Sequence, residues 1–174
     1  VPVITAGAST TALYSVMFKI IKKEEGYIIK SFLKAFRQNF KQSTIIWLLL
    51  IGTGYIVGYD WYIAVTYIKL NRQIINILVA GIIIFLLWGW IFVFPLIACF
   101  ENTIKNMIKN AFLIPISQLP YAVIIILFDI VCIGGTLYNY RTLFYGSIFW
   151  SSIGGSLLVY VNSIFMSKIF EPYR

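Results

Sequence analysis

The stretch from about Ile74 to Phe100 contains no charged residue and is the strongest constraint on the fold. A helix needs about 20 apolar residues to cross the hydrocarbon layer of a membrane, and this stretch supplies them. Of the 174 residues of the chain, 60% are hydrophobic and 11% are charged, whereas ordinary soluble domains have about 25% charged residues. Such a chain cannot cover itself with polar surface. We therefore predict an all-α, polytopic membrane helical bundle.

Four segments are predicted to be complete transmembrane helices, and each contains a long apolar run. The expected spans are about 43–67, 74–100, 118–137 and 146–167. Pro95, near the inner end of the second span, is expected to kink it because proline removes one backbone hydrogen bond. Residues 1–174 are thus predicted to form a single membrane domain. Its residues 1–42 are expected to lie at the cytoplasmic interface, and its residues 43–174 are expected to form the four-span bundle.

Basic side chains set the expected orientation of the spans. The stretch from Lys19 to Lys41 holds seven of the 14 Lys and Arg residues, and clusters of this kind hold a loop on the cytoplasmic side. With four spans and both visible ends inside, eleven basic residues are cytoplasmic and three are outside. The three outer ones are Lys69, Arg72 and Arg141.

Residues 27–42 are predicted to form an amphipathic helix at the inner membrane surface. Its basic stripe consists of Lys30, Lys34, Arg37 and Lys41, which recur every three or four residues. One interpretation is that this stripe binds anionic lipid headgroups or a partner protein. The other is a solvated basic face without a specific partner, because cytoplasmic charge needs no further purpose. The sequence leaves both interpretations open.

Two further segments are predicted to be cytoplasmic. A first helix is expected to begin at Ser9 or Thr10 and to end before Gly26, and its charge-free part is too short to cross the membrane. The second span is expected to continue as a helix into the cytoplasm and to end at Pro115. This continuation carries four polar residues that are candidates for partner contacts, Glu101, Asn102, Lys105 and Asn106.

Small residues spaced by four mark two expected helix-packing faces. Gly54 and Gly58 lie on one face of the first span, and Ser151 and Gly155 lie on one face of the fourth. Small side chains at this spacing let the backbone of another helix approach closely.

The residue types needed for common enzyme chemistry are missing. There is no histidine, no GxSxG, no Walker-type glycine loop and no pair of carboxylates within one predicted element. Cys99 and Cys132 lie in apolar runs without CxxC spacing, so they are expected to be buried thiols rather than metal ligands or a disulfide framework. We predict a protein that is not an enzyme and that has no cofactor or metal. The net charge of +8 is explained by membrane orientation, so no nucleic-acid partner is expected.

Asp129 is the one ionisable residue deep within a predicted span. An intramembrane acid is a candidate functional residue by default, and a proton or ion path is one interpretation. The other is a neutral, hydrogen-bonded Asp that fixes helix packing, with Ser156 as its expected partner at similar depth. Tyr160 and Asn162 are further polar side chains nearby. The packing role is slightly favoured, because a relay needs a second polar group.

Several short segments of the sequence resemble the YesL-like family of small bacterial membrane proteins, over nearly the whole chain. These segments are PVITAGASTTALY (residues 2–14), EEGY (24–27), FLKAFRQNFKQ (32–42), FP (94–95), FENT (100–103), KN (105–106) and NSIFMSKIFE (162–171). Their order and spacing are more specific than any one of them. Asp129 lies outside these segments, so the resemblance assigns it no role.

The resemblance implies a multi-pass protein of the bacterial plasma membrane with no established biochemical activity. Members usually begin with one further apolar helix, which implies a fifth span before the four predicted here. They are often encoded near carbohydrate transporters, glycoside-degrading enzymes and sensor kinases. The first function class is therefore an accessory or regulatory protein for carbohydrate uptake, with a transporter subunit or sensor kinase as partner. The second is a small transporter or substrate-binding component with a path near Asp129.

Overall fold

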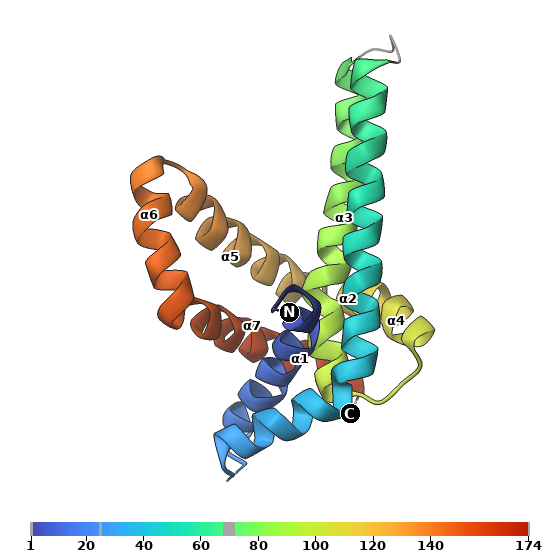
Figure 1. The fold of residues 1–174 in the computed structure, drawn as a ribbon. Coiled ribbons are helices and arrows are strands. Elements are labelled where there is room, and N and C mark those ends of the chain that lie inside the picture. Colours follow the sequence, from blue (N-terminus) through green and yellow to red (C-terminus); the bar gives the residue numbers. More distant parts are fainter. Residues whose placement is uncertain (1, 25, 68–71, 174) are drawn as a thin grey trace.

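The computed structural model describes residues 2–24, 26–67 and 72–173, and the regular structure in these ranges is helical (Figure 1). Thus the predicted all-α class is confirmed. In chain order the helices are α1 (Pro2–Ile21), α2 (Ile28–Thr66), α3 (Arg72–Cys99), α4 (Ile104–Ser117), α5 (Leu119–Leu137), α6 (Tyr140–Phe149) and α7 (Gly155–Phe170). A π-helical turn, Trp150–Gly154, joins α6 to α7, and a 3-10 turn, Glu171–Tyr173, follows α7.

The structure contains a longer first helix than the sequence predicted. α1 runs without interruption from Pro2 to Ile21, so the predicted start at Ser9 or Thr10 is wrong. Its 20 residues make it about 30 Å long, which is the thickness of the hydrocarbon layer. Within the described ranges, five segments are long and apolar enough to cross a membrane, and α1 contributes the one that was not expected.

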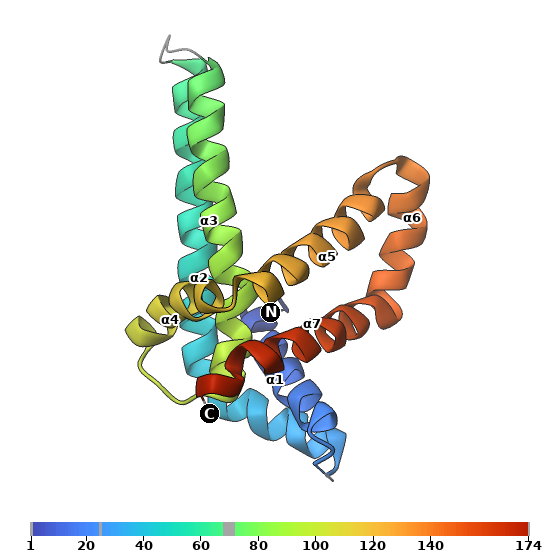
Figure 2. The ribbon, with the colours of Figure 1, turned by 180° about the vertical axis from the view of Figure 1, so that it is seen from behind.

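The second helix combines two predicted elements. α2 has 39 residues and includes both the predicted amphipathic segment and the first span. Its first part lies across the lower end of the molecule, and the helix then turns upward to run beside α3 (Figures 1 and 2). In the upper part of this α2–α3 hairpin, the side chains of Tyr55 and Ile77 are 74% and 71% exposed. Such a continuous apolar surface is expected where a helix pair faces lipid.

The hydrophobic core lies at the lower end of the molecule, where α1, α2, α3, α4, α5 and α7 come together (Figures 1 and 2). In α3, every side chain from Phe92 to Ile97 is buried, including Pro95, because neighbouring helices cover this part on all sides. α1 belongs to this core, with Tyr14 and Phe18 each less than a tenth exposed. Therefore α1 is not the peripheral interfacial helix that the sequence predicted.

The contact between α1 and α2 is close because small residues form it. A Cβ atom added at Gly7 would lie 2.7 Å from Cβ of Trp47 and 2.8 Å from the carbonyl oxygen of Ser43. One turn further, the hydroxyls of Thr11 and Ser43 share a buried hydrogen bond of 2.9 Å. Thr11 also donates to the carbonyl oxygen of Gly7 at 3.0 Å. Glycine and hydroxyl side chains thus let the two backbones approach.

Three other predicted boundaries differ from the structure. α3 ends at Cys99, and α4 begins at Ile104 after a non-helical segment, so the second span does not continue as one helix. α4 contains Pro115 instead of ending there. The fourth apolar segment begins at Tyr140, where the side chain of Asn139 accepts a hydrogen bond from the backbone N–H of Arg141 and caps α6.

The ends of the helices agree with a two-sided arrangement. The turn after α1, the segment from 100 to 103 and the end of α7 lie at the lower end, while α5 meets α6 at the upper end (Figures 1 and 2). Lys69, which was expected outside, is not among the described residues, and neither is the side chain of Arg72.

We expect Gly26 and Lys109 to be cytoplasmic and Arg141 to lie on the outer side. Each is replaced by a single cysteine in a chain that lacks Cys99 and Cys132. An impermeant thiol reagent added to intact cells should label only the Arg141→Cys protein. Labelling at Gly26→Cys or Lys109→Cys before lysis would contradict this orientation.

Candidate functional site

Asp129 is buried in α5 and is held by α7. Its side chain is 7% exposed, and the Nδ2 of Asn162 donates a 2.9 Å hydrogen bond to its Oδ1. Asn162 is itself 1% exposed, and its Oδ1 has no hydrogen-bond partner among the described residues. A buried carboxyl and a buried amide are costly unless they are paired, so this contact fixes α5 against α7.

Tyr14 of α1 completes this polar cluster. Its side chain is buried and lies near the side chains of Asn162 and Asp129. Ser156, the partner that was expected for Asp129, is exposed on α7 and lies outside the cluster. The sequence therefore found the acid but ranked its partners wrongly. Tyr14 was not expected there at all, because α1 was predicted to lie at the membrane surface.

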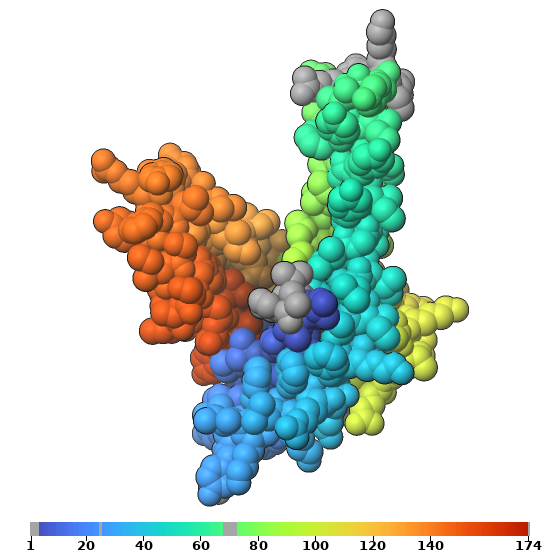
Figure 3. All heavy atoms as spheres, viewed as in Figure 1, coloured from blue at the N-terminus to red at the C-terminus, as the bar shows by residue number. Residues whose placement is uncertain are grey.

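A cleft of about 610 Å³ lies beside this cluster, between α3 and α5. Figure 3 shows the arm formed by α5 and α6 standing apart from the α2–α3 hairpin. The walls of the cleft are almost entirely apolar and include the indole rings of Trp88 and Trp90. Among the described residues that line it, Asp129 alone is ionisable. The indole Nε1 of Trp88 is buried and has no hydrogen-bond partner in the described part of the chain.

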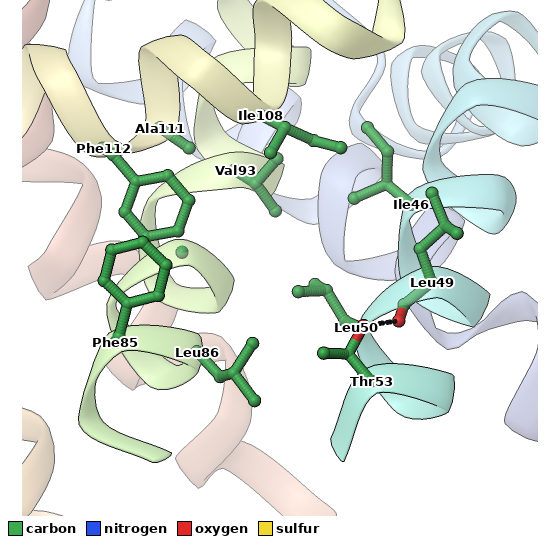
Figure 4. Close-up of a pocket in the computed structure, with 11 residues that line it drawn as sticks. Ile46, Leu49, Leu50, Thr53, Phe85, Leu86, Val93, Ile108, Ala111 and Phe112 are labelled. Atoms are coloured by element: carbon green, nitrogen blue, oxygen red, sulfur yellow. Dashed lines mark hydrogen bonds between the residues drawn. The ribbon is translucent and has the colours of Figure 1, made fainter. Parts of the chain in front are cut away.

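A smaller pocket of about 200 Å³ lies between α2, α3 and α4 (Figure 4). Its labelled side chains are apolar apart from Thr53, whose hydroxyl donates to the carbonyl oxygen of Leu49 at 2.7 Å. Phe85 and Phe112 stack on one side of it, with ring centroids 4.2 Å apart. Since its one hydroxyl is already bonded within α2, this pocket offers little for polar recognition. In the described residues no group of His, Cys, Asp and Glu could hold a metal ion.

The first part of α2 has three distinct faces. Ala35 is buried, and the basic stripe of Lys30, Lys34, Arg37 and Lys41 is exposed. Between these two faces, Ile29, Leu33 and Phe40 expose 75%, 48% and 38% of their surface. A helix that presents apolar side chains directly beside cationic ones matches the geometry of a helix lying in the headgroup layer.

We expect the basic stripe to retain anionic lipid. A variant with Gln at Lys30, Lys34, Arg37 and Lys41 should keep less phosphatidylglycerol after purification, because each basic side chain near the surface contributes about 1 kcal/mol. Mass spectrometry of the bound lipid measures this. The matched control is Lys105→Gln combined with Lys109→Gln. Equal lipid retention in both variants would support the solvated basic face.

The polar residues before α4 make contacts within the chain. The backbone oxygen of Asn102 accepts a 2.8 Å hydrogen bond from Gln42, and its side chain accepts one of 2.9 Å from Asn106. Thr103 caps α4 by accepting from the backbone N–H of Asn106. Glu101 and Lys105 are exposed, and Glu101 precedes the helix that contains Lys105. Asn102 and Asn106 therefore connect α2 to α4.

In the described part of the chain, no other helix lies against the predicted packing glycines. Nothing lies within 4 Å of a Cβ atom added at Gly54 or Gly58, and at Gly155 the nearest atom is the carbonyl oxygen of Trp150, 3.8 Å away. Ser151 is exposed and bonds to its own helix. These faces stay predictions for contacts beyond the chain. The close contacts of glycine instead occur at sites the sequence did not indicate, such as Gly7 and Gly89.

The two cysteines are half-buried rather than fully buried. Cys132 lies one turn after Asp129 on α5, and Cys99 is the last residue of α3. Because both thiols reach the surface in part, they have to be replaced before single-cysteine labelling.

Comparison with known families gives one match. Residues 1–61 match the model of a family described as "Protein of unknown function, DUF624". Comparisons with curated proteins and with solved structures found no match. The matched residues include the α1–α2 contact and Tyr14, while Asp129 and Asn162 follow later in the chain. This family is the YesL-like family of bacterial membrane proteins, so the resemblance is confirmed for residues 1–61, which are similar to a family of membrane proteins of unknown function.

Proposed function

We propose that this chain is a non-enzymatic accessory or regulatory protein of the bacterial plasma membrane that acts with a partner in carbohydrate uptake or utilisation. The link to carbohydrates comes from the family resemblance. The observation that carries the accessory role is the distribution of charge. In the described residues, Asp129 is the ionisable side chain that lies deep within a predicted membrane span, and it is paired with Asn162. The other described charges lie near the ends of the spans, on the first part of α2 and on α4.

The exposed basic stripe of α2 provides a surface for a cytoplasmic partner such as a transporter subunit or a sensor kinase. Tagged protein is purified from native membranes of cells grown on different sugars, after crosslinking. We expect one stoichiometric partner, and Gln at the four stripe positions should reduce its recovery at least about tenfold. Arg141→Gln, at the opposite end of the bundle, is the matched control. Recovery of the chain alone under all conditions would contradict the accessory role.

A second candidate function is a small transporter or substrate-binding component. It is favoured by one observation, which is that Asp129 borders the cleft between α3 and α5. Uptake of a solute into liposomes that contain only the purified chain would support it. Uptake that persists in the Asp129→Asn variant would contradict a path through this side chain.

A further inference from the structure

The carboxyl of Asp129 has both a protein partner and an open side. Asn162 holds its Oδ1 from α7, and the side chain also borders the cleft between α3 and α5. The cleft has a volume of about 610 Å³, within the range of about 300–1,000 Å³ that is typical of pockets for small organic ligands. Asp129 is therefore a buried acid that a ligand in the cleft can reach.

The walls of the cleft restrict the chemistry of that ligand. They consist of aliphatic side chains and the indoles of Trp88 and Trp90, so the body of the ligand has to be apolar. No described residue lining the cleft carries a positive charge that would neutralise Asp129. A purely apolar occupant would leave the carboxyl facing hydrocarbon, which is unfavourable for an acid. Indole rings attract cations through their faces.

Parts of the walls of the cleft are exposed at the surface of the predicted membrane domain. Ile130 of α5 and Ile84 of α3, which line the cleft, expose 60% and 65% of their surface. An apolar ligand dissolved in the membrane thus has a lateral entrance and does not need an aqueous channel.

We propose that the cleft between α3 and α5 binds a lipophilic organic cation, with Asp129 as its counter-ion and Trp88 and Trp90 as its aromatic walls. The proposal is independent of the accessory role. It deepens the second candidate function, because a transporter or substrate-binding component needs such a ligand. Binding without uptake into liposomes would refute transport and leave the site in place, whereas absence of binding would refute the site.

The probe is tetraphenylphosphonium, and its binding to purified protein in detergent is measured by equilibrium dialysis. Tetraphenylborate has the same shape and the opposite charge, so it separates charge recognition from partition into an apolar cleft. We expect the wild-type protein to bind the cation at least about tenfold more tightly than the anion, since the two ions interact with Asp129 with opposite sign. Equal affinity for the two ions would overturn the proposal.

Two variants assign the site to this side chain. Asp129→Asn keeps an oxygen that accepts from Asn162 and removes the charge, and it should weaken cation binding at least about tenfold. Asp60→Asn, on the exposed upper part of α2, is the matched control and should bind as the wild type does. Gly134→Phe fills the cleft without altering the acid, because nothing lies within 4 Å of the added Cβ atom, and it should also abolish binding. Unchanged cation binding in Asp129→Asn or in Gly134→Phe would overturn the proposal.

Discussion

Replacing Gly7 by alanine is expected to destabilise the protein, although alanine normally stabilises a helix. The added methyl group would meet the Cβ atom of Trp47 and the carbonyl oxygen of Ser43 at less than 3.0 Å. Neither atom can swing away, so α1 has to move off α2. Overpacking of this kind costs about 1–3 kcal/mol. The movement also weakens the buried bond between Thr11 and Ser43, for about 1 kcal/mol more.

The gain in helix propensity from glycine to alanine is at most about 1 kcal/mol, so the clash at Gly7 decides the sign. Melting temperature in detergent measures it, and Gly7→Leu should prevent accumulation of folded protein. Gly54→Ala and Gly58→Ala are the matched controls, because their added methyl groups meet nothing within 4 Å. These two should melt at the same temperature as the wild type or higher. A Gly7→Ala protein as stable as its controls would show that α1 does not pack on α2 as described.

Replacing Asp129 by leucine is expected to destabilise the bundle more than replacing it by asparagine. Leucine leaves the buried Nδ2 of Asn162 without its acceptor, which costs about 1–3 kcal/mol. Asparagine keeps an oxygen at that position, so Asp129→Asn should unfold at nearly the wild-type temperature. If the Asp129→Asn protein is stable but cells that carry it lose the function of the wild-type protein, Asp129 acts through its charge. Normal function in these cells removes Asp129 from the functional residues.

A double variant separates pairing from packing at the same position. With leucine at both Asp129 and Asn162, no buried amide is left unpaired, so the double variant should be more stable than Asp129→Leu alone. Thermal unfolding of the two single variants and the double variant completes the cycle. Additive losses would show that the hydrogen bond between α5 and α7 contributes little.

Hydrophobicity and charge predicted most of the fold, since they report directly on which segments leave water. The four expected spans all appear as long apolar helices, and the amphipathic segment is the first part of α2. The length of α1 was missed because Ala6, Gly7, Ala8 and Ser9 suggest a turn in water, whereas in the core these small residues are a helix face pressed against α2. The break at residues 100–103 was missed because no proline or glycine marks it.

The candidate site was predicted only in part. An acid within an apolar run is visible in any sequence, so Asp129 was found. Its partner depends on which face of α7 points at α5, and that phase is set by the π-helical turn before α7. Ser156 was selected because an antiparallel helix places it at a depth similar to that of Asp129, and depth alone does not show which side chain of α7 faces α5. Tyr14 joins the cluster through tertiary packing, which no periodicity within α1 indicates.

The π-helical turn has a consequence for how this protein tolerates changes in length. Trp150–Gly154 is a π-helical turn, in which backbone hydrogen bonds join residues that are five apart in the sequence. This turn therefore holds about one residue more than an α-helical turn. Deleting one residue from within 150–154 can be absorbed by conversion to an α-helical turn, and α7 then keeps its phase. The same deletion between Leu157 and Val161 would rotate Asn162 by about 100° away from Asp129. The wide turn is thus the place in this arm where natural variants can lose a residue without separating the buried pair.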